Sequence, residues 1–171
     1  MSSSTISICK FVGTISLGLL TGVSATLSTL ALPALLTLPT APTANTALVY
    51  LNTRSTALTS YLRHITTFTL FSAYLLSPRR FRHPYLLYTA ILTSIAGPGV
   101  DYAVTASGWQ KEERRAALER EAASSGTGEE DVNGEQVRLA VDRLRVVEGW
   151  RGGVAGLAFA MGVIGLWGDG A

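Results

Sequence analysis

The chain has 171 residues, of which 47% are hydrophobic and 15% are charged, with a mean hydropathy of +0.30 and a formal net charge of +2 at pH 7. So few charges at this length argue against a water-soluble domain and favour a membrane protein. Residues 1–100 hold six basic side chains and no acidic one, whereas residues 101–171 hold all 12 acids and the other eight bases. Because the bases lie among apolar segments or between acids, nucleic acid is excluded as a partner.

The first predicted element is a membrane-spanning helix over residues 11–32. The 43 residues that follow Lys10 carry no charge, and about 20 apolar residues suffice to cross a ~30 Å hydrocarbon core. The apolar stretch is too long for a secretory signal, whose apolar region has about 7 to 15 residues. Pro33, Pro39 and Pro42 should end the span, because proline lacks a backbone N–H and disfavours helix in the preceding residue.

Two further spans are predicted over residues 55–76 and 85–104. A short connection bracketed by Pro78 and Pro84 joins them, so the two helices should be antiparallel neighbours. The segment Gly97–Gly99, with Pro98 at its centre, should kink the last turns of the third span.

Residues 105–149 form a polar segment that holds most of the charge. Strong helix formers with Glu and Arg three or four residues apart predict a solvated helix over residues 109–123. A flexible acidic linker should follow over residues 124–134, and a second helix over residues 135–147. The apolar face of this second helix should pack either on the preceding helix or on the membrane surface. That face consists of Val137, Ala140, Val141, Leu144 and Val147.

A fourth span is predicted over residues 152–167, inside a carboxyl-terminal unit of residues 150–171. Trp150 and Trp167 are suited to anchor its two ends at the membrane interfaces. Sixteen residues are few for a crossing, so a re-entrant hairpin or a buried helix is the alternative. The predicted fold is therefore an all-α membrane protein with about four transmembrane helices. Three of them lie in residues 1–104, and one polar, partly helical loop separates the third from the fourth.

Small residues recur every four positions in the first and fourth spans. Gly18 and Gly22 form such a pair in the first span, and Gly152 and Gly156 form one in the fourth. In lipid, small residues let two helix backbones approach closely enough for van der Waals contact. We expect these ridges to pack the two spans against each other within one chain. Homodimerisation through the ridges and chance spacing in a chain rich in Gly and Ala are the alternatives.

Two charged residues lie inside predicted spans, Arg63 in the second and Asp101 in the third. Counted from the connection between these antiparallel helices, both lie about 20–24 Å away, which places them near one depth. A charge in lipid costs several kcal/mol unless it is partnered, so we expect a stabilising Arg63–Asp101 pair. Independent snorkelling to the interface and a transport pathway are the alternatives.

The connection between the second and third spans is the first candidate for an interaction site. Its cations should lie at the level of the phospholipid headgroups, where each contributes about 1 kcal/mol near an anionic surface. A simple anchor that fixes topology is the alternative. The candidate residues are Arg79, Arg80, Arg82, His83, Pro84 and Tyr85.

Catalytic signatures are missing from the sequence. It has no HExxH or CxxC motif, no P-loop, no GxSxG and no dinucleotide fingerprint, and only His64 and His83 are histidines. The sequence therefore predicts a protein that is not an enzyme and has no metal site or cofactor. Cys9, the single cysteine, cannot form an internal disulfide, and we expect a structural role, with reversible acylation as the alternative.

Three stretches carry a resemblance to a known family. They are KFVGTISLGLLTG at residues 10–22, RHPYLLY at residues 82–88 and GVIGLWGDG at residues 162–170. Together with the four-span layout they resemble the fungal autophagy-related protein 33 family, and RHPYLLY is the most specific of them. The resemblance implies a multi-pass protein of the mitochondrial outer membrane that promotes mitophagy. It supplies no catalytic residues. The expected partners are membrane lipids, and other mitochondrial membrane proteins or a second copy of the chain through the glycine ridges.

A direct tether to the autophagosome would expose an aromatic residue followed, after two spacers, by an aliphatic one. In the polar segment Trp109 is followed by Glu112, which does not fit, and the fitting pair Tyr88 and Ile91 lies inside the third predicted span. We therefore expect the chain to act upstream of the tether or through membrane partners. A small transporter or channel subunit, or an assembly scaffold that uses the glycine ridges, is the alternative function.

Overall fold

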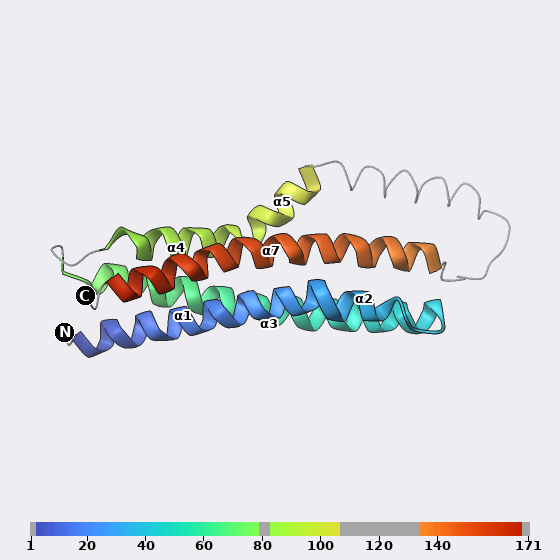
Figure 1. Ribbon diagram of the computed structural model, residues 1–171, viewed down its shortest axis with the longest axis horizontal. Helices are drawn as coiled ribbons and strands as arrows, with labels where there is room; N and C mark the ends of the chain where they lie inside the picture. The colour runs from blue at the N-terminus through green and yellow to red at the C-terminus, as the bar shows by residue number, and fades with distance from the viewer. Residues whose placement is uncertain (1–2, 79–82, 107–133, 169–171) are drawn as a thin grey trace.

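The computed structural model describes residues 3–78, 83–106 and 134–168, and every regular element in these ranges is a helix (Figure 1). The predicted all-α class is thus confirmed. The long helices lie side by side, and α1 (Ser3–Thr26) begins at the end of the bundle where α7 (Gly134–Gly168) finishes (Figure 1). The predicted helix over residues 109–123, most of the predicted linker and the cations Arg79, Arg80 and Arg82 lie outside the described residues.

The first apolar helix extends beyond its predicted end. From α1 it continues through a π-helical turn, η1 (Leu27–Ala31), into α2 (Leu32–Leu35). The N–H of Leu32 donates to the carbonyl oxygen of Leu27, five residues earlier. Pro33 follows this wider turn without ending the helix, because the π turn shifts the carbonyl that its ring would otherwise meet. The rod ends at the turn over residues 36–40, which leads back along the bundle.

The second helix, α3 (Ala41–Leu76), begins well before the predicted start at residue 55. Pro42 lies in its first turn, where a missing N–H leaves no intrahelical bond unmade. The predicted span over residues 55–76 lies within α3. The helix continues past Arg54 because a charge limits what can enter lipid and does not by itself end a helix.

The third predicted span is two helices, α4 (Pro84–Ile95) and α5 (Pro98–Ala106). The N–H of Ala96 still donates to the carbonyl of Leu92, at 2.9 Å, and the regular helix ends there. Proline at position 98 cannot donate the next bond, so the predicted kink is a full break. Beyond the break, α5 turns away from the axis of α4 (Figure 1).

One continuous helix, α7, replaces the predicted separate helices over residues 135–147 and 152–167. Three glycines, Gly149, Gly152 and Gly153, lie inside this helix without ending it. An interior glycine costs a helix about 1 kcal/mol, which packing against neighbouring helices can offset. The apolar face of its first half packs on α2 and α3, which is neither of the two expected partners. This cluster consists of Leu32, Ala44, Leu48, Val137 and Val141.

Two of the described helices are long and apolar enough to cross a membrane, Ser4–Leu35 and Gly134–Gly168, by length and composition alone. Their most apolar windows are only 22% and 17% buried inside the bundle, so most of each window faces outward. The described part of α4 is apolar but has 12 residues. The predicted count of four spans is therefore not established by these criteria.

Candidate functional site

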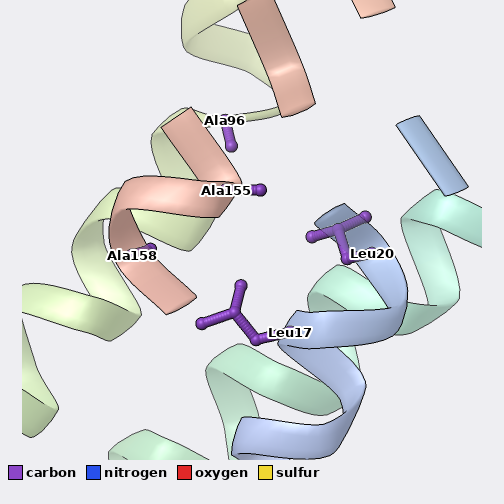
Figure 2. Close-up of a cluster of buried hydrophobic side chains, with 5 residues drawn as sticks. All are labelled: Leu17, Leu20, Ala96, Ala155 and Ala158. Atoms are coloured by element: carbon purple, nitrogen blue, oxygen red, sulfur yellow. The ribbon is translucent and has the colours of Figure 1, made fainter. Parts of the chain in front are cut away.

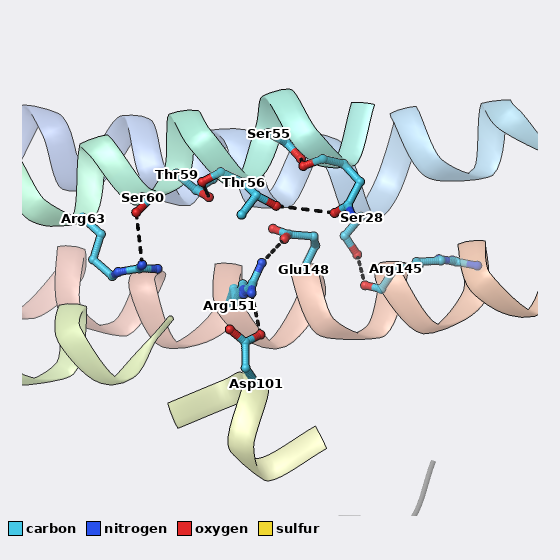
Figure 3. A network of polar contacts seen from close by, with 11 residues as sticks. Ser28, Ser55, Thr56, Thr59, Ser60, Arg63, Asp101, Arg145, Glu148 and Arg151 are labelled. Atoms are coloured by element: carbon cyan, nitrogen blue, oxygen red, sulfur yellow. Dashed lines mark hydrogen bonds and ion pairs between the residues drawn. The ribbon is translucent and has the colours of Figure 1, made fainter. Parts of the chain in front are cut away.

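Four charged side chains lie near one another in the middle of the bundle, with Arg63 displaced from the other three along the helix axes, and we call this group the charge layer (Figure 3). Arg151 Nη1 donates to Glu148 Oε1 at 2.5 Å, and its Nη2 donates to Asp101 Oδ1, also at 2.5 Å. Arg151 thereby joins α7 to α5. The members of the charge layer are Arg63, Asp101, Glu148 and Arg151, two cations and two anions.

Local structure explains how Arg151 reaches two carboxylates. Glu148 is three residues before Arg151 on α7, a spacing that places both side chains on one helix face. Asp101 lies in the first turn of α5, directly after the break at Gly97 and before α5 leads away from the bundle (Figure 1). The side chain of Glu148 is 4% exposed and that of Asp101 is 52% exposed. Burying an unpaired carboxylate costs several kcal/mol in lost hydration, and the ion pair with Arg151 offsets this cost for Glu148.

Arg63 does not pair with its expected partner, Asp101. Its Nη2 donates to Ser60 Oγ at a long 3.4 Å, and among the described residues no ion pair joins it to Asp101. The guanidinium lies against Gly97, where an added Cβ would collide with it. The expected pair is therefore wrong, because the break after α4 carries Asp101 toward α7 and to Arg151.

A small pocket separates the two arginines of the charge layer. It has room for about one water molecule. Nearby, Glu148 Oε2 and Arg151 Nε have no hydrogen-bond partner among the described residues. The pocket is lined by Leu20, Ser24, Thr59, Arg63, Ala96 and Arg151.

The glycines of the predicted ridges differ in their surroundings. An added Cβ at Gly18 would lie 3.0 Å from the ring of Phe159 on α7, and one at Gly156 would lie 3.4 Å from Thr21 Cγ2 on α1. At Gly152 it would lie 3.4 Å from the backbone nitrogen of Ala25. These three positions lie between α1 and α7, whereas a Cβ at Gly22 would meet nothing within 4 Å.

A buried cluster of leucines from α1 and alanines, two of them from α7, lies between these helices (Figure 2). The cluster is flanked by Leu62, Leu92, Val154 and Phe159, so it joins all four long helical segments. Alanines on α7 let the leucines of α1 approach closely. The buried members are Leu17, Leu20, Ala96, Ala155 and Ala158.

The described part of the cationic connection lies beside the beginning of the chain. His83 is the residue directly before α4, Pro84 is the first residue of that helix, and the rings of His83 and Tyr85 are 6.2 Å apart. Lys10 Nζ lies 6.0 Å from the centre of the Tyr85 ring, within the range of a cation–π contact. Tyr85 also leaves no room for a Cβ at Gly165. Lys10 thus adds a cation to this end of the bundle.

Glu148 and Arg151 are the site residues that sequence analysis missed. Their signal was present, because an acid and an arginine three residues apart directly before an apolar run can pair on one helix face. Within the described residues no three His, Cys, Asp or Glu side chains are grouped so as to hold a metal ion. Arg151 binds both anions of the charge layer, and through Asp101 it holds α7 to α5.

Comparison with known proteins decides the family. The model of the family described as autophagy-related protein 33 matches residues 1–143. The chain belongs to this family. It is also 38% identical to autophagy-related protein 33 of Gibberella zeae over 187 aligned positions, which cover 99% of this chain and 94% of the relative. No solved structure matches the chain.

The autophagy-related protein 33 match confirms the resemblance drawn from three short stretches, and it connects the chain with autophagy. Arg63 and Asp101 lie inside the part that the family model matches, whereas Glu148 and Arg151 follow it. The alignment to the Gibberella zeae relative extends over nearly the whole chain and thus over both halves of the charge layer.

Proposed function

We propose that this chain is a non-enzymatic multi-pass protein of the mitochondrial outer membrane that promotes mitophagy. The family assignment supports the link to autophagy. The resemblance of the RHPYLLY connection and the helical layout to mitochondrial members of that family motivates the organelle and the selective process.

The membrane part of the proposal rests on the apolar side chains exposed at the surface of the bundle. Large apolar side chains point away from it, among them Phe11, Phe68, Leu157 and Ile164, each more than 60% exposed. A water-soluble protein of this size rarely exposes so much contiguous apolar surface. Exposing this apolar surface to lipid acyl chains carries no hydration cost, unlike exposing it to water.

The interior of the same part of the bundle is rich in hydroxyl groups. Several hydroxyls donate to carbonyls of their own helix, such as Thr89 to Tyr85 and Thr93 to Thr89, both at 2.7 Å. Small hydroxyl residues at helix contacts are typical of membrane bundles, where apolar burial gains little. The buried hydroxyl residues are Ser16, Ser24, Thr59, Thr66, Ser77, Thr89 and Thr93.

Four segments are suited to cross the bilayer in this proposal: α1, the second half of α3, α4 and the second half of α7. The charge layer then fixes how these segments pack, since Arg151 links α7 to α5, and Arg63 of α3 lies against the break that ends α4. We infer a role in assembling or stabilising a membrane complex upstream of the autophagosome tether.

The experiment that tests the function removes the gene from its host. We expect slower delivery of a mitochondrial matrix reporter to the vacuole under starvation, with unchanged delivery of a cytosolic reporter of bulk autophagy. Re-expression of the full chain should restore the mitochondrial signal. Unchanged mitochondrial turnover in the deletion strain would refute the proposal.

A small transporter or channel subunit is the second candidate, favoured by the pocket between Arg63 and Arg151. Replacing Arg63 by Gln should then abolish flux through reconstituted protein while its abundance stays normal. A structural role for Arg63 predicts reduced abundance instead, since the guanidinium fills the space beside Gly97.

A further inference from the structure

The long helices exceed what a bilayer can cover. The helices α3 and α7 have 36 and 35 residues. At 1.5 Å per residue each is over 50 Å long, compared with a hydrocarbon core of ~30 Å. If the helix axes are near the membrane normal, about 20 Å of α3 and of α7 must lie outside the hydrocarbon core. The pattern of side chains along the helices identifies which end lies outside.

The polarity of the buried residues changes at the charge layer. At this layer and on the side of the termini, the seven buried hydroxyl residues lie in the interior beside buried leucines and alanines, and large apolar side chains are exposed. On the other side, which we call the distal segment (residues 27–53 and 134–147), the interior is entirely apolar. Its buried residues are Leu27, Leu32, Ala44, Leu48, Val137, Val141 and Val147.

The charged side chains of the distal segment all lie on α7, since residues 27–53 have none. Glu135, Arg138 and Arg145 are exposed on α7, and Arg138 lies 3.9 Å from Asp142 in an exposed ion pair. A charge at mid-membrane costs several kcal/mol, so this half of α7 cannot lie in hydrocarbon at low cost. An apolar interior beneath a partly charged surface is the pattern of a helix bundle in water.

The neighbours of this half of α7 must lie outside the bilayer with it. Leu32 and Leu48 pack against Val137 and Val141 in one buried cluster. Ser28 Oγ also donates to the backbone carbonyl of Arg145, at 3.0 Å. The charge-free run that begins after Lys10 is therefore divided between two environments, although its composition alone indicates lipid throughout.

Aromatic residues mark the border. Tyr61, Tyr102 and Trp150 are exposed on three helices near the level of the charge layer. Tyrosine and tryptophan are enriched where hydrocarbon meets headgroups, and arginines just inside the border can extend to the interface. From Arg151 to Trp167, the next exposed tryptophan, α7 rises about 24 Å, a short but sufficient crossing with snorkelling at one end.

We infer that lipid binds only the half of the bundle that holds the termini, and that the distal segment projects from the bilayer as a three-helix bundle in water. This inference rests on the proposed membrane function and narrows it: the lipid-binding surface ends at the charge layer. The projecting bundle is then the part that aqueous partners can reach.

Two matched pairs of single cysteines test the border in a chain whose Cys9 is replaced by Ser. Tyr50 and Phe68 lie on the same face of α3, about five turns apart, and are 65% and 73% exposed. Leu139 and Leu157 form the equivalent pair on α7. Each residue is replaced by Cys in the full chain, which is reconstituted in phosphatidylcholine and phosphatidylethanolamine vesicles and treated with N-ethylmaleimide. The cysteine thiolate is the nucleophile that adds to the double bond of the maleimide, and hydrocarbon excludes the thiolate, so only cysteines in water are modified.

The expected result is modification at positions 50 and 139 and protection at positions 68 and 157, with all four reacting after denaturation. Protection at all four positions would overturn the border while leaving a membrane protein. Modification at all four would overturn the membrane proposal itself. Gel filtration of each variant in detergent verifies that the bundle is folded.

Discussion

Arg151 on α7 donates to Asp101 on α5 at 2.5 Å, although the two residues are 50 positions apart in the chain. The same guanidinium donates to Glu148, which is almost fully buried. A single arginine therefore stabilises a buried carboxylate and also holds α5, beyond the break at Gly97, against the bundle.

Replacing Arg151 by Met should destabilise the protein strongly. Removal of one partner from a buried pair leaves the other charge uncompensated, a loss of about 3–5 kcal/mol. We expect a large fall in the midpoint of thermal unfolding in detergent and low abundance in cells.

Arg138→Met is the matched control for this change. It breaks an ion pair on the same helix whose side chains are 62% and 45% exposed. Such pairs contribute about 0–1 kcal/mol, so the midpoint should hardly move. Equal effects of the two substitutions would show that the charge layer has no special role.

The choice of Arg63 as the partner of Asp101 failed for a geometric reason. Equal depth was inferred from two straight antiparallel helices. The break at Gly97 changes the direction of the chain just before Asp101, and no count of residues along a helix reveals that direction. The nearer partner, Arg151, lies on a helix that the sequence could not place beside α5.

Gly18→Leu should disrupt the contact of α1 with α7, because a side chain there meets Phe159. Overpacking of this kind costs about 1–3 kcal/mol. Gly22→Leu should be tolerated, since its Cβ faces open space one turn further along the same helix. Thermal unfolding of the two variants in detergent measures the difference. If Gly22→Leu were the more damaging change, the open face of α1 would be a contact with a second chain.

Gly165→Ala should loosen the contact of α7 with α4, because the new methyl group would collide with the ring of Tyr85. Gly153→Ala on the same helix meets nothing within 4 Å, and alanine favours helix over glycine by about 1 kcal/mol. The first variant should unfold at a lower temperature than the parent protein and the second at the same or a higher one. The reverse order would contradict the placement of Tyr85.

Leu48→Ala should open the interior of the distal segment, where Leu48 is buried against Val137 and Val141. Truncation of a buried leucine in a bundle surrounded by water costs about 2–5 kcal/mol. We expect faster proteolysis within residues 36–53 of membrane-bound protein, with the membrane association unchanged. Tyr50→Ala, at an exposed position two residues later, is the control and should leave proteolysis unaltered.

The composition of the chain predicts its helices well and their ends poorly. Hydropathy identifies apolar helices around residues 11–32 and 152–167, and the Gly97–Gly99 segment predicts the break between α4 and α5. The start of α3 was placed too late, because Arg54 marks where lipid is expected to begin and the helix continues past it. The helix α7 was divided in two before residue 152, although it continues through this region. Packing that joins Leu32 to Val141 depends on tertiary structure, which periodicity does not specify.

The most direct measurement of the central claim is alkaline carbonate extraction of mitochondria isolated from cells that express the full chain. A bundle whose apolar half lies in lipid should stay in the membrane pellet together with a known integral protein of the outer membrane, while a peripheral marker is released. Recovery of the chain in the supernatant would contradict the account, because its exposed apolar surface would then require another explanation.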